Sequence, residues 1–369
     1  MQWNWELREW PEFRYEAQAL TLLEARFLQK AGEISGVFFH VAEEEQLRLR
    51  IEFLSEEALR SSLIEGERLN RESVQASIQR NFGIHTSEHF RPLPREQGIA
   101  DLLGHAYSTF AEPLTQDMLF HWHRLLLGGS LWDDKVGGYR DDAEEMQVVS
   151  GAIHAPKLHY QAPPAAKVPD EMGRFFQFLE QSQPTKSSLP LPALTRAGLA
   201  HLYFLAIHPF ADGNGRLARV ISQKALWQAV GRPYLASLSH VIEAGRKKYD
   251  SVLERTNRTL EVTDWLLYFA ETVLESLEYS QQCLEFLLKK SRFFDHYGPQ
   301  LNPRQHKVLR RLFQAGPQGF EGGLSAGNYQ SISNTSSATA RRDLNELVQL
   351  GALTRTGERK GTRYFLHLK

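Results

Sequence analysis

The chain is organised around a twelve-residue segment, residues 208–219, which reads His-Pro-Phe-Ala-Asp-Gly-Asn-Gly-Arg-Leu-Ala-Arg. The preceding residues, Ala197–Ile207, are largely apolar, as in a buried helix. The following residues, Leu217–Val230, carry apolar side chains at helical spacing and stop before Gly231, a helix-ending residue. The segment is therefore predicted to be a turn between two packed helices.

The polar residues of this turn are suited to binding an anion. Gly213 and Gly215 flank Asn214 at the start of the second helix, where backbone N–H groups and the helix dipole attract negative charge. Arg216 and Arg219 lie on one face of its first turns, although each cation there opposes the dipole by ~0.3–1 kcal/mol. A bound polyphosphate would account for both arginines; solvated arginines beside a helix cap are the alternative.

Two further side chains of the turn fit phosphate chemistry. Asp212 offers the hard carboxylate oxygen that Mg²⁺ prefers, together with substrate phosphates. The pKa of His208 suits a general base that removes a proton from a hydroxyl. A buried structural histidine is the alternative for that position.

This segment matches the Fic-domain signature, His-x-Phe-x-Asp/Glu-Gly-Asn-Gly-Arg-x-x-Arg, at every defined position, so the chain resembles the Fic family. The resemblance implies a mainly α fold, a helical core with a small β-hairpin flap, that transfers AMP from ATP to a hydroxyl of a target protein. It implies that His208 is the base, that Asp212 holds Mg²⁺, and that Asn214, Arg216 and Arg219 complete the catalytic set. The nucleotide-binding positions that it implies are Gly213, Asn214, Gly215, Arg216, Leu217, Ala218, Arg219, Gly245 and Tyr249.

Two of the implied positions, Gly245 and Tyr249, are the ones that would contact the nucleotide base. Many Fic proteins have Asn where this chain has Gly245, which removes a side-chain contact and leaves the base specificity open. Tyr249 has two interpretations, a ring that stacks on the purine or a tyrosine of the core.

A second motif precedes the signature. Residues 61–66, Ser-Ser-Leu-Ile-Glu-Gly, form by composition a helix that ends at a glycine. Beside a Fic signature they resemble the family's inhibitory motif, Ser/Thr-x-x-x-Glu-Gly/Asn, with Ser61, Glu65 and Gly66 in the defined places. A carboxylate there is expected to form a bidentate ion pair with Arg219 and to occupy the γ-phosphate site.

Two surface features have open interpretations. The aromatic opening (Trp3, Trp5, Trp10, Phe13 and Tyr15) is expected to dock onto the rest of the fold, with a ligand cage as the alternative. Residues 147–150 and 157–160 are predicted to form a hairpin after Gly137-Gly138-Tyr139-Arg140. In Fic proteins such a flap pairs with the target segment by β-augmentation; a simple surface hairpin is the alternative.

The last 68 residues differ from the rest in charge. They carry eleven Lys or Arg against four Asp or Glu, in a chain whose net charge is −1. Their pattern of helix, short helix, capped helix and two-stranded ribbon resembles a winged helix-turn-helix. Contact with DNA phosphates and bases is expected from Arg341, Arg342, Arg359 and Lys360. Docking of a protein or dimerisation is the alternative.

Composition sets the remaining expectations. The 369 residues predict two or three domains, placed at residues 1–95, 96–295 and 300–369. One cysteine excludes an internal disulfide framework and makes a structural zinc site improbable, and the lack of a signal peptide or long apolar run indicates a cytoplasmic protein with no membrane partner. A homodimer is plausible for this family.

Three functions follow. The first is a protein adenylyltransferase, restrained by Glu65, that modifies Ser, Thr or Tyr hydroxyls. The second removes AMP with the same residues, Glu65 then positioning a water molecule. The third is a DNA-binding regulator whose Fic domain senses nucleotide or modifies its own chain.

Overall fold

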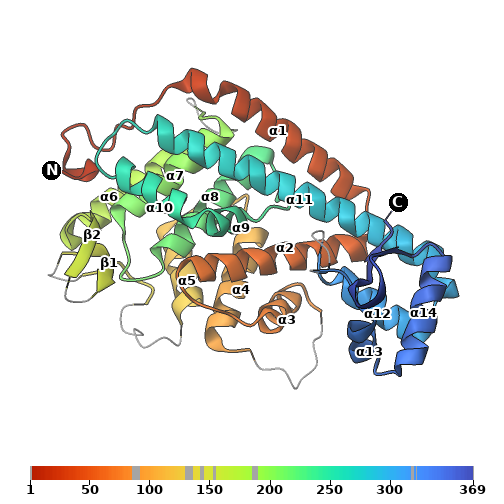
Figure 1. Cartoon of the computed structure of the whole chain (residues 1–369). Coiled ribbons are helices and arrows are strands. Elements are labelled where there is room, and N and C mark those ends of the chain that lie inside the picture. The colour runs from red at the N-terminus through yellow and green to blue at the C-terminus, as the bar shows by residue number, and fades with distance from the viewer. Residues whose placement is uncertain are drawn as a thin grey trace. The chain divides into compact units, whose positions relative to one another are not determined.

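The computed structural model describes residues 2–84, 92–128, 136–141, 145–152, 155–184, 190–316, 320 and 322–368, with the side chains of residues 151, 152, 155 and 360 outside that description. The chain divides into two compact units, Met1–Glu278 and Tyr279–Lys369. The described part is mainly helical, with two antiparallel two-stranded sheets (Figure 1), which confirms the predicted fold class. The division into three domains stays a prediction.

The first unit opens with the aromatic segment and a set of helices. A short helix, η1 (Asn4–Glu6), precedes α1 (Ala17–Phe39), α2 (Glu43–Ile64) and α3 (Arg71–Asn81). The ring of Trp3 lies 5.3 Å from that of Tyr160, and the ring of Trp10 lies 5.3 Å from that of Tyr203. The prediction that the opening docks onto the fold is confirmed.

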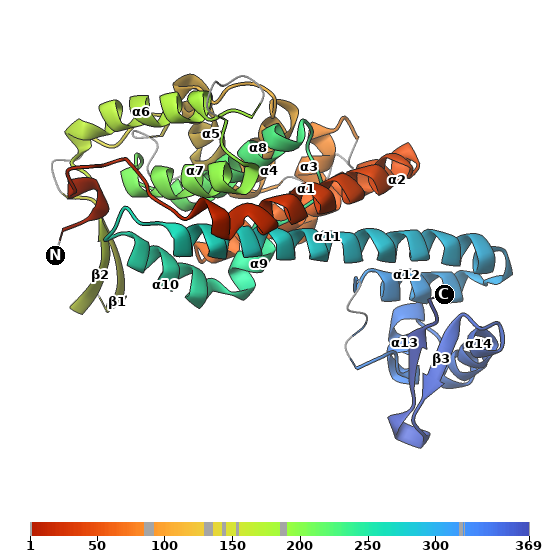
Figure 2. The ribbon, with the colours of Figure 1, turned by 90° about the horizontal axis from the view of Figure 1, so that it is seen from above.

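The rest of this unit surrounds α7 (Ala193–Ile207), which is buried on almost every side. Around it are α4 (Pro94–Ser108), α5 (Gln116–Leu127), α6 (Val168–Gln181) after η3 (Ala165–Lys167), α8 (Asn214–Val230) and the start of α11 (Thr263–Tyr297). Figure 2 shows α7 beside α1 and α11. A methyl group on Gly198 would lie 2.8 Å from a terminal methyl of Leu266, so α7 and α11 approach closely at this glycine.

A β-hairpin and two short helices separated by a glycine complete the unit. Strands β1 (Gln147–Ala152) and β2 (Ala155–Gln161) pair antiparallel, as predicted, with a register shift between Val148 and Val149. The sequence from about Ile242 to Arg258 predicts one helix, and this prediction is wrong: the structure has α9 (Leu238–Ala244) and α10 (Arg246–Thr256). Ser237 caps α9 from an earlier start, and Gly245 separates the two helices.

The second unit has the predicted winged-helix pattern. After η4 (Gly298–Gln300) come α12 (Pro303–Phe313), α13 (Ala326–Ser333) and α14 (Ser337–Gln349), then β3 (Leu353–Thr356), η5 (Arg359–Gly361) and β4 (Arg363–Leu366). Asn334, in the left-handed region at φ 50°, turns the chain between α13 and α14. Buried Asp343 of α14 accepts hydrogen bonds from Arg304 and Tyr329, which joins the three helices.

Among the helices within the described ranges, none combines the length and the apolar character needed to cross a membrane.

Candidate active site

The signature loop takes its shape from two left-handed residues and one amide. His208 (φ 51°, ψ 59°) ends α7, and Gly213 (φ 84°) is the N-cap of α8. The Asn214 side chain accepts a hydrogen bond from the Phe210 N–H (3.0 Å) and donates one to the Phe210 carbonyl (2.7 Å). Asn214 was expected to bind phosphate, but its side chain is buried and shapes the loop, so its backbone N–H is the group that faces the anion site.

His208 is held as a neutral base. Arg140 donates from Nε to the His208 carbonyl at 2.8 Å, and its Nη2 donates to the Pro163 carbonyl. The His208 Nδ1 lies 3.2 Å from the Leu205 carbonyl, so it carries the proton and Nε2 is the acceptor. Burial lowers the pKa of His208 to about 4.

That pKa leads to a prediction about pH. Because burial disfavours the charged ring, His208 is in its basic form at every pH above about 4. For a chain relieved of Glu65, kcat/KM for nucleotide transfer should stay within about twofold from pH 6 to pH 8, and the acid limb should lie well below the ordinary histidine pKa of about 6.5. An inflection near 6.5 in a rate–pH profile would contradict this placement of His208.

A histidine that the sequence did not indicate supports the loop from α5. The His123 ring stacks on buried Phe210 with centroids 4.0 Å apart. Its Nδ1 accepts from the Gly137 N–H at 2.9 Å, so its Nε2–H donates to the Asp212 carbonyl at 3.2 Å. In the sequence, His121 and His123 are two residues apart in a predicted helix, which places them on different faces and does not suit a metal pair. The role of His123 was not visible there, because Phe210 is far away in sequence.

Arg219 lies under the C-terminus of α2. It is 1% exposed, and its Nε and Nη2 donate to the Ser61 hydroxyl and carbonyl, each at 2.9 Å. Nη2 also donates to Glu65 Oε1 at 2.7 Å. The ion pair is thus formed through one carboxylate oxygen, and the expected bidentate arrangement is wrong: Ser61 accepts from Nε and shares Nη2 with Glu65.

The Glu65 carboxylate occupies the anion site itself. A methyl group on Gly215 would lie 2.2 Å from Glu65 Oε1, so the carboxylate rests against the first turn of α8. Burial by itself raises the pKa of Glu65, but the neighbouring Arg219 outweighs it and the net pKa is lowered. Gly66, at φ 86°, ends this segment in a conformation that favours glycine.

A second carboxylate of the same segment contacts the other arginine. Glu67 Oε2 accepts from Arg216 Nη1 at 2.8 Å, and Asp212 Oδ2 lies 3.3 Å from Arg216 Nη2. The Arg216 side chain is 3% exposed, that of Asp212 58%. Glu67 was missed because it lies outside the motif, although a carboxylate two residues after Glu65 was the available signal.

The C-terminal half of α2 is fixed to α9. Glu57 is buried and accepts hydrogen bonds from the Ser237 hydroxyl (3.0 Å), the Ser239 N–H (3.0 Å) and the Ser239 hydroxyl. Glu56 bonds to Arg60 and Arg71 from α2 and α3. These contacts hold Glu65 over α8 from outside the signature.

A cavity of about 390 Å³ lies beside the signature loop, between the hairpin, α8 and α10. Its walls include Glu65, His208, Gly215, Arg219 and Tyr249 among the predicted residues. The Tyr249 ring is buried and its hydroxyl lies 2.8 Å from His201 Nε2, which supports the interpretation as a core tyrosine.

Six of the nine implied nucleotide-binding positions are not among the residues that line this cavity: Gly213, Asn214, Arg216, Leu217, Ala218 and Gly245. Leu217 and Ala218 are fully buried in the hydrophobic core. Besides Tyr249, the α10 residues that line it are Arg246, Asp250, Leu253 and Glu254. The spacing of Arg246, Asp250 and Glu254, four residues apart on one helix face, was the signal in the sequence.

Asp212 fits a magnesium ion only in part. Groups of three or more metal-binding side chains are absent from the described part of the chain. Mg²⁺ is bound in many phosphate-transfer sites through one or two carboxylates and the substrate phosphates, and Asp212 offers one exposed carboxylate beside the anion site. The residues present therefore fit Mg²⁺ that arrives with a nucleotide.

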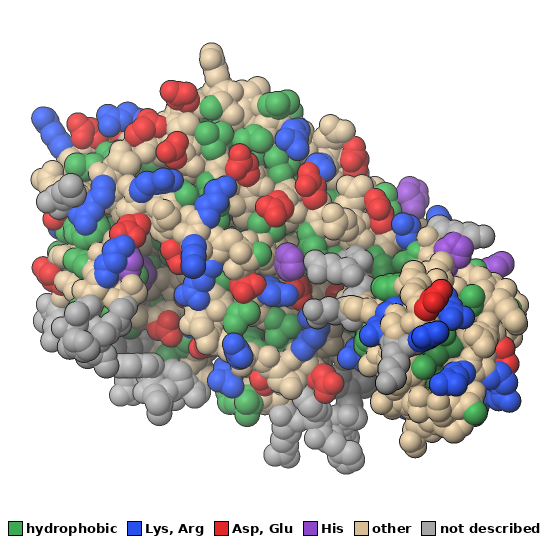
Figure 3. Space-filling model, in the orientation of Figure 1, with side chains coloured by type: hydrophobic (Ala, Val, Ile, Leu, Met, Phe, Trp, Pro, Cys, Tyr) green, Lys and Arg blue, Asp and Glu red, His purple; other side chains and the backbone are tan. Residues whose placement is uncertain are grey.

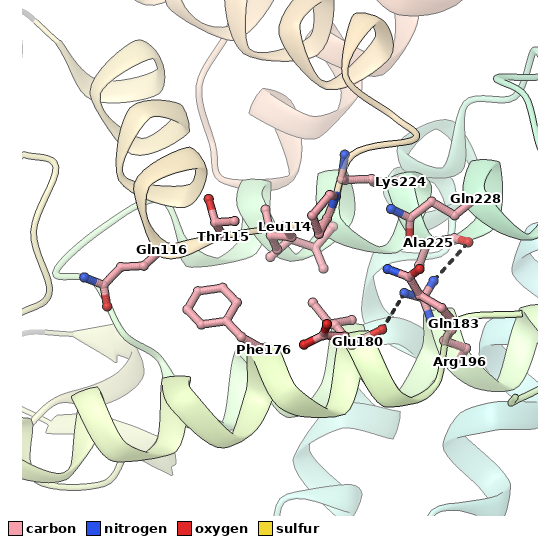
Figure 4. Close-up of a pocket in the computed structure, with 13 residues that line it drawn as sticks. Leu114, Thr115, Gln116, Phe176, Glu180, Gln183, Arg196, Lys224, Ala225 and Gln228 are labelled. Carbon is pink, nitrogen blue, oxygen red and sulfur yellow. Dashed lines mark hydrogen bonds between the residues drawn. The ribbon is translucent and has the colours of Figure 1, made fainter. Parts of the chain in front are cut away.

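A second cavity of about 390 Å³ lies between α6 and α8 (Figure 4). Two buried cations line it, Arg196 and Lys224. Arg196 donates to the Leu179 and Ala225 carbonyls, and Lys224 donates to the Thr109 carbonyl. Since these contacts are with the backbone, both cations stabilise the packing of the helices around this cavity.

The residues expected to contact DNA lie in the second unit. Arg341 and Arg342 are exposed on the first turns of α14, and Arg359 is exposed in η5, with φ 51°. The side chain of Lys360 lies outside the description. Lys and Arg side chains are visible on the face of this unit that Figure 3 presents.

Comparison with known proteins extends these observations. Residues 113–226 match the model of the Fic/DOC family, residues 330–358 that of the DeoR-like helix-turn-helix domain, and residues 3–84 a domain of unknown function (DUF4172). A uridine 5'-monophosphate transferase of Xanthomonas campestris is 30% identical over 188 residues, which are 43% of this chain. The chain spans only 34% of the length of that relative.

Solved structures share the fold. A Fic family protein from Desulfovibrio desulfuricans matches 95% of this chain and 97% of its own, with a TM-score of 0.52 and 23% identity. Fic-1 from C. elegans matches 74% of this chain and 75% of its own, with a TM-score of 0.52 and 20% identity. Together with the signature loop, these matches show that the chain contains a Fic/DOC domain at residues 113–226 and a DeoR-like helix-turn-helix region at residues 330–358.

Proposed function

We propose that this chain is a protein nucleotidyltransferase that transfers AMP from ATP to a Ser, Thr or Tyr hydroxyl of a target protein. The observation that carries the proposal is the anion site at the N-terminus of α8, where a carboxylate rests on Gly215 between two buried arginines. Such a site suits the phosphates of a nucleoside triphosphate.

Each side chain has a role in this reaction. His208 Nε2 accepts the proton of the target hydroxyl, whose oxygen attacks the α-phosphorus while pyrophosphate leaves. Arg216 and Arg219 neutralise the charge of the β- and γ-phosphates, so catalysis is mainly positioning and electrostatics. Mg²⁺ held by Asp212 would add charge neutralisation on the phosphates.

Glu65 and Glu67 restrain this activity. Both carboxylates are bonded to the arginines that the phosphates need, so a triphosphate must displace them before it binds productively. The inhibitory segment, residues 61–67, then lowers the population of the competent state and reduces the apparent affinity in proportion.

The test uses the full-length Glu65→Gly protein with Mg²⁺, a cell lysate and ATP, UTP, GTP or CTP labelled at the α-phosphate. Labelled bands of lysate proteins with ATP that vanish in the Glu65→Gly/His208→Ala variant support AMP transfer. Bands with UTP in place of ATP keep the mechanism and replace the base, as the transferase from Xanthomonas suggests. No labelled band with any nucleotide contradicts transfer and favours AMP removal, in which release of AMP from a modified protein would require Glu65.

A second function, DNA binding, is favoured by the winged-helix unit. Its residues 330–358 match a DeoR-like helix-turn-helix model, and Arg341 and Arg342 are exposed at the start of α14. This is where a recognition helix contacts the major groove. A homodimer also remains part of the proposal.

The DNA proposal predicts a charge effect confined to one helix. Arg341→Glu/Arg342→Glu should weaken binding of genomic fragments at least about tenfold and lower the salt slope by about two, because two phosphate contacts are lost. A gel shift at several salt concentrations measures both. The matched control is Arg310→Glu/Arg311→Glu, the same charge change on exposed positions of α12. Equal weakening by both pairs would mean that α14 is not the contact surface.

A further inference from the structure

The hairpin carries a chain of hydrogen bonds between a serine, a histidine and a carboxylate. Ser150 Oγ on β1 lies 2.6 Å from His159 Nε2 on β2, and His159 Nδ1 lies 3.1 Å from Glu254 Oε2 on α10. Ser150 pairs with Lys157 across the hairpin, so His159 is its diagonal neighbour on the same face. The register shift beside His159 turns its ring toward α10.

The protonation of these three hydrogen-bonded side chains is set by Glu254. Hydrogen bonds from Lys157 and His159 lower the pKa of Glu254, so its carboxylate is ionised and only accepts. His159 Nδ1 therefore carries the proton, and Nε2 accepts the proton of the Ser150 hydroxyl. A serine donating to a histidine that a carboxylate orients is the arrangement of an activated nucleophile.

Ser150 also lines the cavity of the candidate active site. Three residues with hydroxyl groups are among the described residues of its wall: Ser150, Tyr160 and Tyr249. The Tyr160 hydroxyl donates to the Ala206 carbonyl at 2.6 Å, the Tyr249 hydroxyl contacts His201, and both rings are buried. Ser150 is exposed, and within the described residues the one hydrogen-bond partner of its hydroxyl is the ring of His159, which is a base.

We propose that Ser150 is a self-modification site, the hydroxyl of this chain that accepts a nucleoside monophosphate once the inhibitory segment leaves Arg219. This inference rests on the proposed function, because the donor is the nucleoside triphosphate of the same cavity. A bond forms between Ser150 Oγ and the α-phosphorus, and the bond from that phosphorus to pyrophosphate breaks. The Ser150 proton passes to His159 Nε2, and the resulting imidazolium is stabilised by Glu254.

Modification of Ser150 would affect entry of nucleotide into the active-site cavity. A nucleoside monophosphate joined to Ser150 by a phosphodiester occupies the cavity that the next triphosphate must enter. Self-modification would thereby limit the activity of a chain that has lost its restraint.

The experiment follows one peptide. Trypsin releases residues 141–157, in which Ser150 is the only residue with a hydroxyl side chain. The full-length Glu65→Gly protein is incubated with Mg²⁺ and each nucleoside triphosphate, without other proteins, and digested for mass spectrometry. We expect one nucleoside monophosphate on this peptide, at a rate independent of protein concentration. Ser150→Ala should remove the modification, and Ser108→Ala, a change of an exposed serine on α4, should retain it.

The base is tested separately. His159→Gln should slow modification of Ser150 by about 10²-fold, the usual contribution of a general base, while the labelling of added target proteins falls far less. Equal loss of both would overturn the role of His159. An unlabelled 141–157 peptide in a protein that labels lysate proteins overturns the inference alone. No labelling of any protein removes the proposed function as well.

Discussion

In the Glu65→Gly background, His208→Ala should reduce nucleotide transfer by about 10³-fold, within the range that a positioned general base contributes. The ring is held neutral with Nε2 as its acceptor, and alanine offers no group that removes the hydroxyl proton. The substitution leaves the anion site intact, because Arg216, Arg219 and the first turn of α8 are unchanged. Nucleotide binding, measured as a shift in Tm, should therefore persist while the labelling rate falls.

A control separates this effect from a general loss of stability. His40 is an exposed histidine after α1 and lies outside the candidate site, so His40→Ala should keep the full rate. A His208→Ala protein that binds nucleotide and retains a third of the labelling rate would exclude His208 as the base.

Glu65→Gly should raise the rate of nucleotide transfer at least about 10²-fold, the change expected when about 3 kcal/mol of competition is removed from the competent state. The carboxylate lies 2.7 Å from Arg219 and against Gly215, where it fills the anion site. Glycine suits this position, because Glu65 is the residue that ends α2 and Gly66 follows in the left-handed region.

The same substitution should lower stability. Removal of Glu65 leaves the buried Arg219 without its compensating charge, but the Glu65 side chain is 36% exposed, so the cost stays below the about 3–5 kcal/mol of a fully buried pair. The two bonds from Arg219 to Ser61 reduce that cost. A nucleoside triphosphate should restore Tm in Glu65→Gly more than in the unmodified chain, since its phosphates replace the lost carboxylate.

Two further variants test whether the charge of Glu65 causes the inhibition. Glu65→Gln keeps the shape and removes the charge, so it should share most of the gain in rate. Glu33→Gln, on α1 beside Gln29, removes a carboxylate far from α8 along the chain and should change neither rate nor Tm. A Glu65→Gly protein with no gain in rate and no added response to nucleotide would contradict the inhibitory role.

Local sequence patterns predicted part of the helical structure. Apolar patterning predicted α7 and α8, and the glycine after Val230 predicted the end of α8, where Gly231 lies at φ 76°. The break at Gly245 was missed, because apolar spacing continues on both sides of it and one glycine inside a helical pattern is compatible with either outcome.

The roles of polar side chains were less accessible to the sequence. Asn214 and Tyr249 have the chemistry to contact a nucleotide, yet Phe210 and His201 satisfy them within the fold. His123 and Glu67 belong to the site although neither is part of a motif. A buried polar group must find a partner, and that partner is set by neighbours in space.

The sequence by itself determined the identity of the signature loop, its place as a turn between two helices and the helical character of the chain, because these depend on residues within a few positions of one another. The resemblance predicted that Glu65 reaches Arg219, 154 residues further along the chain, and only the tertiary structure decided that it does so through one oxygen. The tertiary structure also decided that Ser150, His159 and Glu254 form one hydrogen-bonded chain. Those contacts depend on how α2 packs on α9 and how the hairpin lies against α10, and packing of distant segments leaves no periodic pattern in the sequence.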